Sequence, residues 1–254
     1  MSAMPQSGKL EQAYPAASAP PSHERLTGAI RSLAFVYQPI VRWSARKVIA
    51  HEALVRSAEP GLEGALALFD AARILNRQRE LGGAVRGRLG ADLSTIQGDL
   101  FVNVEPPDLL DAGLYDPRSP LCQNSERVVL EITERASLSF VPEVRRRVFK
   151  LRDLGFRIAA DDIGADYSGL TNLAVLQPDV VKIDMNLVRN VDREPTRRKV
   201  IASLAELCAE MGSVVVAEGV ETADERDALV ALGCDLLQGH LFARAAGRPP
   251  AVRW

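Results

Sequence analysis

Three short apolar runs decide the fold: Val128-Val129-Leu130-Glu131-Ile132, Ile158-Ala159-Ala160-Asp161-Asp162 and Val180-Val181-Lys182-Ile183. Short, nearly continuous apolar runs are typical of strands that are buried on both faces, as in a parallel sheet. Longer, charged segments of helical character separate the runs. This alternation indicates a mainly parallel sheet covered by helices, and each of its strands carries a polar group in or just after the apolar run.

The same rhythm continues in both directions along the chain. Further strand-like runs lie at Phe35 to Ile40, Val48 to Val55, Phe101 to Val104, Val214 to Ala217 and Leu236-Leu237. Seven or eight such strands in one domain favour a closed barrel, so we predict an α/β fold of the TIM-type (β/α)8 class and allow for one atypical antiparallel strand near the start. A doubly wound open sheet is the alternative, although the sequence contains neither GxGxxG nor a P-loop.

Two of the intervening segments carry local helix signals. Thr222 and Glu225 form a plausible capping box that would open a helix. Upstream, four apolar residues recur at helical spacing and predict the buried face of another helix. These residues are Val200, Leu204, Leu207 and Met211.

Bulk properties exclude several classes of protein. The 254 residues, of which 47% are hydrophobic, suit one large domain or two small ones with a buried core. The net charge of −2 argues against a protein that binds nucleic-acid polymers through bulk electrostatics. Cys122, Cys208 and Cys234 form no CxxC pair, which disfavours a disulfide framework or a zinc site and fits a reducing compartment.

The composition changes once, near residue 25. Residues 1–25 are rich in Ala, Ser and Pro and predict a disordered tail, whereas residues 26–254 have the composition of one globular domain. No apolar run approaches the length of a transmembrane helix, and the N-terminus lacks the features of a signal peptide. We therefore expect a cytoplasmic protein without a membrane segment.

Polar residues cluster at one end of the predicted barrel. Functional groups of such barrels sit at the C-terminal ends of the strands. Here those ends carry acidic or amide side chains and one lysine: Glu52, Asn103, Glu131, Asp161, Asp162, Lys182, Glu218 and Gln238. A lone acidic residue at a strand end is usually a solvated rim residue, but that explanation would have to hold for nearly every strand at once.

Carboxylates that converge on one barrel mouth repel and raise one another's pKa. Multivalent cations would neutralise the cluster, and ligands that are all oxygen suit Mg²⁺ or Mn²⁺. The histidines are poorly placed as ligands, since His23 lies in the predicted tail and His51 and His240 only flank candidate residues. Within the adjacent Asp161-Asp162 pair, one aspartate could bridge two metals, and paired metals suit in-line hydrolysis of a phosphodiester.

The motifs around these residues resemble those of the EAL-domain cyclic di-GMP phosphodiesterases. The signature Glu-Ala-Leu is Glu52-Ala53-Leu54, followed by Val55 and Arg56. The other matching blocks follow in the family's order: Tyr37-Gln38-Pro39-Ile40-Val41 upstream, then Phe101-Val102-Asn103-Val104, Leu130-Glu131-Ile132-Thr133-Glu134, Asp161-Asp162-Ile163-Gly164, Val181-Lys182-Ile183-Asp184, Ala217-Glu218-Gly219-Val220-Glu221-Thr222 and Gln238-Gly239. Together they cover roughly residues 32–242.

The resemblance implies a hydrolase that opens one phosphodiester bond of cyclic di-GMP and releases the linear dinucleotide pGpG. It also implies two Mg²⁺ or Mn²⁺ ions in each site. The first ion would be held by Glu52, Asn103, Glu131 and Asp161, and the second by Asp161, Asp162 and Glu218. Barrels of this family often pair, so a homodimer is a further expectation.

The resemblance assigns the remaining roles residue by residue. Lys182 would orient or help to deprotonate the attacking water, with Glu52 and Glu218 as its catalytic neighbours. Glu134 and Glu221 would fix the loop after the aspartate pair. The substrate would be contacted by Gln38, Arg56 and Gln238. A guanidinium can grip a phosphate with two hydrogen bonds, although a salt bridge at the rim is the other interpretation of Arg56.

Several positions depart from the family's usual pattern. Ser57 stands where an aromatic is common, Ile163 where a Phe is usual, and Ala165-Asp166 where Thr-Gly is usual; His240 replaces a Tyr, and Ala245-Ala246 stand where a Pro is common. Asp166 matters most because it adds a negative charge near the cluster and tolerates a positive φ less well than Gly. The inferred metal ligands and Lys182 are all present, so activity is the favoured expectation.

Other functions stay open at this point. A barrel with this sequence could be a weak or inactive receptor for cyclic di-GMP, or a protein-interaction module. An enolase-type lyase would need a Lys or His base placed for carbon-acid chemistry. A purely structural barrel with an acidic rim is the remaining alternative.

Overall fold

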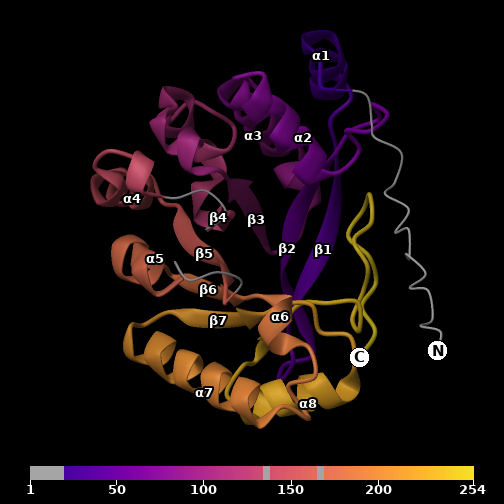
Figure 1. Cartoon of the computed structure of the whole chain (residues 1–254), viewed down its shortest axis with the longest axis vertical. Coiled ribbons are helices and arrows are strands. Elements are labelled where there is room, and N and C mark those ends of the chain that lie inside the picture. The colour runs from indigo at the N-terminus through magenta and orange to yellow at the C-terminus, as the bar shows by residue number, and fades with distance from the viewer. Residues whose placement is uncertain (1–19, 134–137, 165–168) are drawn as a thin grey trace, which may run out of the picture.

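The computed structural model describes residues 20–133, 138–164 and 169–254. Its strands close into a barrel in which neighbours follow the order of the chain, from β1 to β8 (Figure 1). The strands are β1 Ala34–Arg42, β2 Lys47–Arg56, β3 Asp99–Val104, β4 Val128–Thr133, β5 Arg157–Ile163, β6 Val180–Ile183, β7 Val214–Ala217 and β8 Leu236–Leu237. Each predicted apolar run therefore lies within a strand, and closure rules out the open sheet.

One strand runs against the others. β1 pairs antiparallel with both β2 and β8. All the remaining neighbours, from β2 to β8, pair in parallel. The barrel class and the atypical strand near the start are both confirmed. Because β2 to β8 point the same way, their C-terminal ends meet at one mouth of the barrel.

Helices cover the outside of the barrel (Figure 1). The α-helices are α1 His23–Arg31, α2 Ala65–Ile74, α3 Gln78–Asp92, α4 Val144–Asp153, α5 Gly169–Leu176, α6 Met185–Val188, α7 Pro195–Glu210 and α8 Ala223–Ala231. Short 3-10 helices are η1 Leu93–Thr95, η2 Pro106–Leu110, η3 Ala112–Tyr115, η4 Cys122–Arg127 and η5 Leu138–Phe140. Among the helices of the described part of the chain, none has the length and apolar character that crossing a bilayer requires.

The core has an inner and an outer part. Inside the barrel, each strand contributes one apolar side chain to a single layer: Ile40, Ala50, Phe101, Val129, Ala159, Val180, Val216 and Leu236. Alternate residues of the same strands point outward and pack against the helices in two further clusters. This alternation follows from the two-residue period of a strand. The inner layer closes the barrel beneath its mouth.

The predicted buried face of the helix now identified as α7 is wrong. Val200, Leu207 and Met211 are each more than a third exposed, and Leu204 is only partly buried. The fully buried residues of α7 are Ile201 and Cys208. They lie seven residues apart, and each directly follows a residue of the predicted face, so the buried face is displaced by one residue from the predicted one. The larger apolar side chains suggested the neighbouring face because a small buried Cys contributes little to the hydrophobic pattern.

Two helix N-termini bear on the sequence expectations. The capping box of Thr222 and Glu225 is confirmed, since Thr222 is the N-cap of α8 and both reciprocal hydrogen bonds are present. At the other end of the chain, α1 begins at His23, with Ser22 as its N-cap. Helical structure thus starts within the segment 1–25 for which the composition predicts a tail.

Candidate active site

A ring of polar side chains lies directly above the apolar inner layer. On every strand, the residue two positions nearer the mouth than the apolar one is polar: Gln38, Glu52, Asn103, Glu131, Asp161, Lys182, Glu218 and Gln238. Glu218 and Gln238 follow the last strand residues, but their backbone N–H groups still donate to Ile183 and Ala217 of the neighbouring strands. The two-residue period therefore points all eight side chains into the barrel.

Lys182 is the centre of this ring. Its Nζ lies 2.5 Å from Glu131 Oε1, 2.5 Å from Glu218 Oε1, 3.2 Å from Asp161 Oδ1 and 3.5 Å from Glu52 Oε2. The Lys182 side chain is 1% exposed and that of Glu131 is 0% exposed. One buried ammonium thus faces four carboxyl groups, an imbalance that favours either protonation of some of them or the binding of a cation.

The electrostatics of the ring follow from burial and from this charge imbalance. Burial raises the pKa of Glu131 well above its ordinary value, with Lys182 opposing and the other carboxylates reinforcing the shift. The pKa of Glu218 rises to about 8 for the same reasons. Burial alone would lower the pKa of Lys182, but Asp161, Glu131, Glu218 and Glu52 outweigh it and raise that pKa. Lys182 is therefore a protonated donor in this arrangement.

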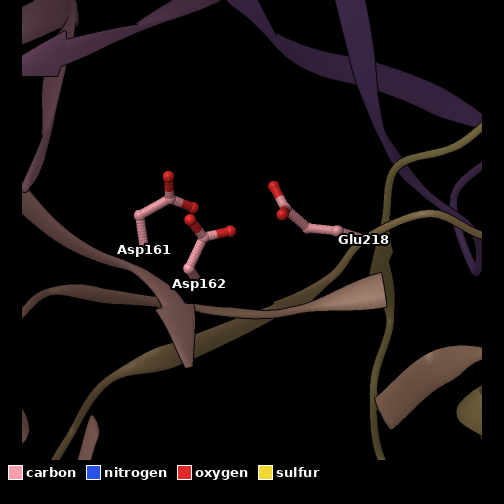
Figure 2. Close-up of side chains that lie close together, drawn as sticks. All are labelled: Asp161, Asp162 and Glu218. Carbon is pink, nitrogen blue, oxygen red and sulfur yellow. The ribbon is translucent and has the colours of Figure 1, made fainter. Parts of the chain in front are cut away.

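A bulge aims both aspartates of the pair at the mouth. Successive residues of a regular strand point to opposite faces. The register of β5 against β6 shifts between Ala160 and Ile163, and Asp162 has a φ of 58°. Figure 2 shows the carboxylates of Asp161, Asp162 and Glu218 turned toward one another, and one oxygen from each lies within 4.8 Å of the others. An Asp tolerates the left-handed backbone that this turn requires.

Several buried carboxylate oxygens of the ring have no hydrogen-bond donor. These atoms are both Oε of Glu131 and Oδ1 of Asp161, whose contacts with Lys182 are ion pairs without hydrogen-bond geometry. Buried polar atoms nearly always have a partner. A divalent cation with oxygen ligands would complete their coordination, so the donor set fits Mg²⁺ or Mn²⁺.

The three amides of the ring gather around Glu52. Asn103 Nδ2 donates to Glu52 Oε1 at 3.2 Å, and Gln238 Nε2 donates to Glu52 Oε2 at 2.7 Å. Gln238 also donates to Gln38 Oε1 at 3.3 Å, and Gln38 Nε2 donates to the backbone oxygen of Ala243. The structure thus brings Gln38 and Gln238 to the same point as the expected metal ligands.

The other expected residues lie farther out. Arg56 follows Glu52 on the same face of β2, but its Nη1 donates to the backbone oxygen of Val55 and its side chain does not line the cavity. Glu221 pairs with Arg189 at 2.8 Å and is 47% exposed, outside the ring. Glu134, Ala165 and Asp166 fall outside the described residues.

A cavity of about 320 Å³ opens from the ring toward α2. Besides Glu52, Asn103, Asp161, Asp162, Lys182 and Glu218, its wall includes the charged residues Asp70, Arg73 and Glu105. Burial and the nearby charge of Asp108 together raise the pKa of Glu105 to about 7. Sequence reasoning missed all three residues. Asp70 and Arg73 lie on α2, and helical spacing does not reveal what a helix face contacts. Glu105 directly follows β3, two residues beyond Asn103, so its position at the end of a strand was a signal that could have found it.

Comparison with known proteins gives one consistent family. The model of the EAL domain matches residues 23–245. Among curated relatives, the cyclic di-GMP phosphodiesterase RocR of Pseudomonas aeruginosa is 34% identical over 150 residues, which are 58% of this chain and 38% of the relative. The chain thus spans well under half the length of that relative.

Solved structures with the same fold contain the dinucleotide. A manganese and cyclic di-GMP complex of Klebsiella pneumoniae BlrP1 is 32% identical with a TM-score of 0.76, over 88% of this chain and 58% of that one. The cyclic di-GMP-bound form of a standalone EAL protein from Vibrio cholerae O395 is 27% identical with a TM-score of 0.71, over 87% of this chain and 95% of that one.

Proposed function

The chain belongs to the EAL domain family, and on this premise we propose that it hydrolyses one phosphodiester bond of cyclic di-GMP and releases linear pGpG. The observation that carries the proposal is the polar ring, in which Lys182 contacts four carboxylates directly above the apolar inner layer. The relatives support the substrate, because RocR is a cyclic di-GMP phosphodiesterase and BlrP1 binds this dinucleotide together with manganese.

Two Mg²⁺ or Mn²⁺ ions complete the proposed site. Glu52, Asn103, Glu131 and Asp161 would hold one of them, and Asp161, Asp162 and Glu218 would hold the other. The buried oxygens of Glu131 and Asp161 that accept no hydrogen bond support this assignment. When bound, such ions neutralise the developing charge on a phosphoryl group and lower the pKa of water.

The protein's own side chains do the remaining work. Lys182 is held by its four carboxylate contacts, so its ammonium can donate to water or to a phosphate oxygen at a fixed point. It could accept a proton only after losing one. Gln38 and Gln238 point into the ring, where their amides can contact the dinucleotide. Arg56 lies on the same strand face as Glu52 and would swing from the Val55 carbonyl to a phosphate.

The direct test is incubation of purified protein with cyclic di-GMP and Mg²⁺ or Mn²⁺, with chromatographic analysis of the products. We expect pGpG to accumulate, excess chelator to stop its formation and added metal to restore it. Full activity in excess chelator would refute the metal assignment. Binding of cyclic di-GMP with no turnover under any metal condition would instead make the chain a receptor, which is the alternative function.

Three further properties remain predictions. We expect a cytoplasmic protein, a homodimer and a disordered tail that ends before α1. Light scattering of the purified chain gives its molar mass in solution and so distinguishes a monomer from a dimer. Limited proteolysis from the N-terminus shows how far the tail extends. Cell fractionation tests the location.

A further inference from the structure

One helix on the outside of the barrel concentrates positive charge. The ten residues of α4 contain five of the chain's 31 lysines and arginines and one acid, Asp153. The chain as a whole has a net charge of −2, so this positive charge is local. Figure 1 shows α4 at the edge of the molecule, where it packs against α5 and β5. The buried residues of α4 are Val148 and Leu151, so its opposite side faces solvent.

Three of the cations lie on the exposed side of α4: Arg145, Arg146 and Lys150. Arg145 donates to a backbone oxygen of α5, and the Lys150 ammonium lies 5.5 Å from the centre of the Tyr115 ring, so neither cation has an acidic partner within the described ranges of the chain. Arg146 pairs with Glu143 at 3.2 Å, but these side chains are 82% and 64% exposed, and such a pair contributes little. Residues 143–153 thus hold five cations against two acids.

Two phenylalanines project from the same segment. Phe140 in η5 is 85% exposed and Phe149 in α4 is 52% exposed, whereas the other five phenylalanines of the chain are buried or half-buried. Leu138 and Val141, on either side of Phe140, are both buried. The segment is therefore anchored to the core, and it exposes the Phe140 ring while its neighbours are packed.

Helical spacing places the aromatic ring of α4 among the cations. Phe149 follows Arg145 by four residues and Arg146 by three, so these side chains are neighbours on one face. Lys150 follows Arg146 by four residues and extends the same face. Arginine and lysine can lay their apolar stems along such a ring while their charged heads stay at a polar surface. Basic helices with exposed aromatic residues are typical of segments that lie at the surface of an anionic bilayer.

We propose that the exposed face of α4 formed by Arg145, Arg146, Phe149 and Lys150, together with Phe140, binds the surface of a bilayer that contains anionic lipid. The cations match the phosphate headgroups, and the phenyl rings enter the boundary between headgroups and acyl chains. A bilayer receives separate rings without a matching pocket, whereas a protein partner would need a pocket for each ring.

Two features of the chain fit this surface. Residues 1–19 contain one lysine and one glutamate, so that segment offers the face no complementary charge. Attachment through α4 needs no membrane-spanning helix. The face contains no residue of the polar ring or of the cavity beside it, so the inference goes beyond the proposed function and does not depend on it.

The first test is co-sedimentation of the full chain with vesicles of phosphatidylcholine alone and with vesicles that also contain phosphatidylglycerol. We expect binding to the second kind only, and binding should weaken as sodium chloride is added, because salt screens the attraction. Each cation near such a surface contributes about 1 kcal/mol, so Arg146→Gln with Lys150→Gln should lower the partition coefficient about 10- to 30-fold. Arg79→Gln with Arg88→Gln is the matched control, because it removes the same charge from the exposed side of α3.

The second test places the ring of residue 149. In Phe149→Trp, brominated lipid in the anionic vesicles should quench the added tryptophan emission, measured against the original protein with its own Trp43 and Trp254. Ile74→Trp is the control, since Ile74 is 67% exposed at the end of α2, away from the proposed face. Its added emission should not be quenched.

Several outcomes would overturn the proposal. These are no binding to anionic vesicles, equal binding to both kinds of vesicle, and an equal loss in the α3 control. Binding to soluble polyglutamate as tight as to vesicles, without quenching at position 149, would make the face a site for an acidic protein instead. The salt dependence of the original protein decides the matter even if thermal melting shows that a variant has not folded. Hydrolysis of cyclic di-GMP is measured separately, so its failure would not imitate any of these results.

Discussion

At the scale of single residues, Glu52 holds several other side chains of the polar ring in place. Its carboxylate accepts from Asn103 and Gln238 and contacts Lys182, so three other ring members depend on its position. Such a residue has opposite effects on folding and on chemistry. Its charge adds to the repulsion within a buried acidic cluster, whereas the same charge would help to hold a cation.

Replacing Glu52 with Ala should therefore separate the two effects. We expect turnover of cyclic di-GMP to fall at least about 100-fold, since even groups that only support metal ligands contribute 10- to 100-fold. The melting temperature of the metal-free protein should stay close to that of the original, because relief of repulsion offsets the lost contacts. Steady-state kinetics and thermal melting measure these quantities. Glu63→Ala, in the exposed connection after β2, is the control, and turnover within a few-fold of it would contradict the role of Glu52.

Gly164 is the second residue on which the aspartate pair depends. It has a φ of 103°, and a Cβ there would lie 2.2 Å from Leu187 Cδ1. Gly164→Ala should lower the free energy of unfolding by about 1–3 kcal/mol through strain at positive φ and the clash. Gly83→Ala is the matched control: Gly83 lies in α3 with open space around it, so the same change should stabilise by about 0.5–1 kcal/mol. Urea denaturation of both variants checks the difference, and equal effects would disprove it.

The site could be predicted from the sequence where it lies on strands. Because side chains alternate along a strand, polar residues spaced two apart from an inward apolar residue also point into the barrel, as Glu131 does two residues after Val129. The backbone turn at Asp162 could not be predicted, since its positive φ arises from a bulge that depends on pairing with β6. The sequence directed attention instead to position 166, which falls outside the described residues.

At the scale of elements, strands were easier to predict than helix faces. All eight apolar runs lie in strands, because a strand in a closed barrel is buried on both sides whatever its neighbours are. A helix buries only one face, and which face depends on what it meets. For α7 the large apolar residues lie partly exposed while Cys208 is buried. For α2, nothing in the spacing indicated that Leu66 and Arg73 would line a cavity.

At the N-terminus of α8, the carboxylate of Glu225 links three segments of the chain by hydrogen bonds. Glu225 is 2% exposed and accepts from the backbone N–H groups of Asn190, Glu221 and Thr222. Burial alone would raise its pKa, but these hydrogen bonds and the charge of Arg189 outweigh burial and lower the pKa of Glu225. The connection after Glu218 is thereby fixed to α8 and to the end of α6.

A lowered carboxyl pKa stabilises the fold above the unfolded value and loses that effect as the pH falls through the folded value. Glu225→Gln should therefore reduce the free energy of unfolding at pH 7 by about 1–3 kcal/mol. The difference from the original protein should shrink as the pH falls below about 4.5. Asp227→Asn, on the exposed side of α8, should have no measurable effect. Denaturation series across pH test this, and a difference that does not change with pH would show that the charge of Glu225 is irrelevant.

At the scale of the whole molecule, the barrel concentrates charge that its overall composition conceals. The net charge is only −2, yet five carboxyl groups converge on one mouth, and Lys182 contacts four of them. Closure causes this concentration, because each strand contributes one ring residue above an apolar layer. A fold that buries unbalanced charge sacrifices stability at the place where it binds its ligand.

Cation binding should therefore raise the free energy of unfolding of the domain. A ligand that binds only the folded state, present at a concentration 100 times its dissociation constant, raises the free energy of unfolding by about 2.7 kcal/mol. For a domain of this size, that corresponds to a rise in melting temperature of roughly 5 to 10 °C. We expect Mn²⁺ or Mg²⁺ to raise the melting temperature of chelated protein by this amount, whereas sodium chloride of equal ionic strength should not. Asp162→Asn removes a charge assigned to one ion only, so its rise should be smaller and need more metal. If both proteins melt at the same temperature with and without divalent cation, the ring does not bind metal and its charge must be balanced by another partner.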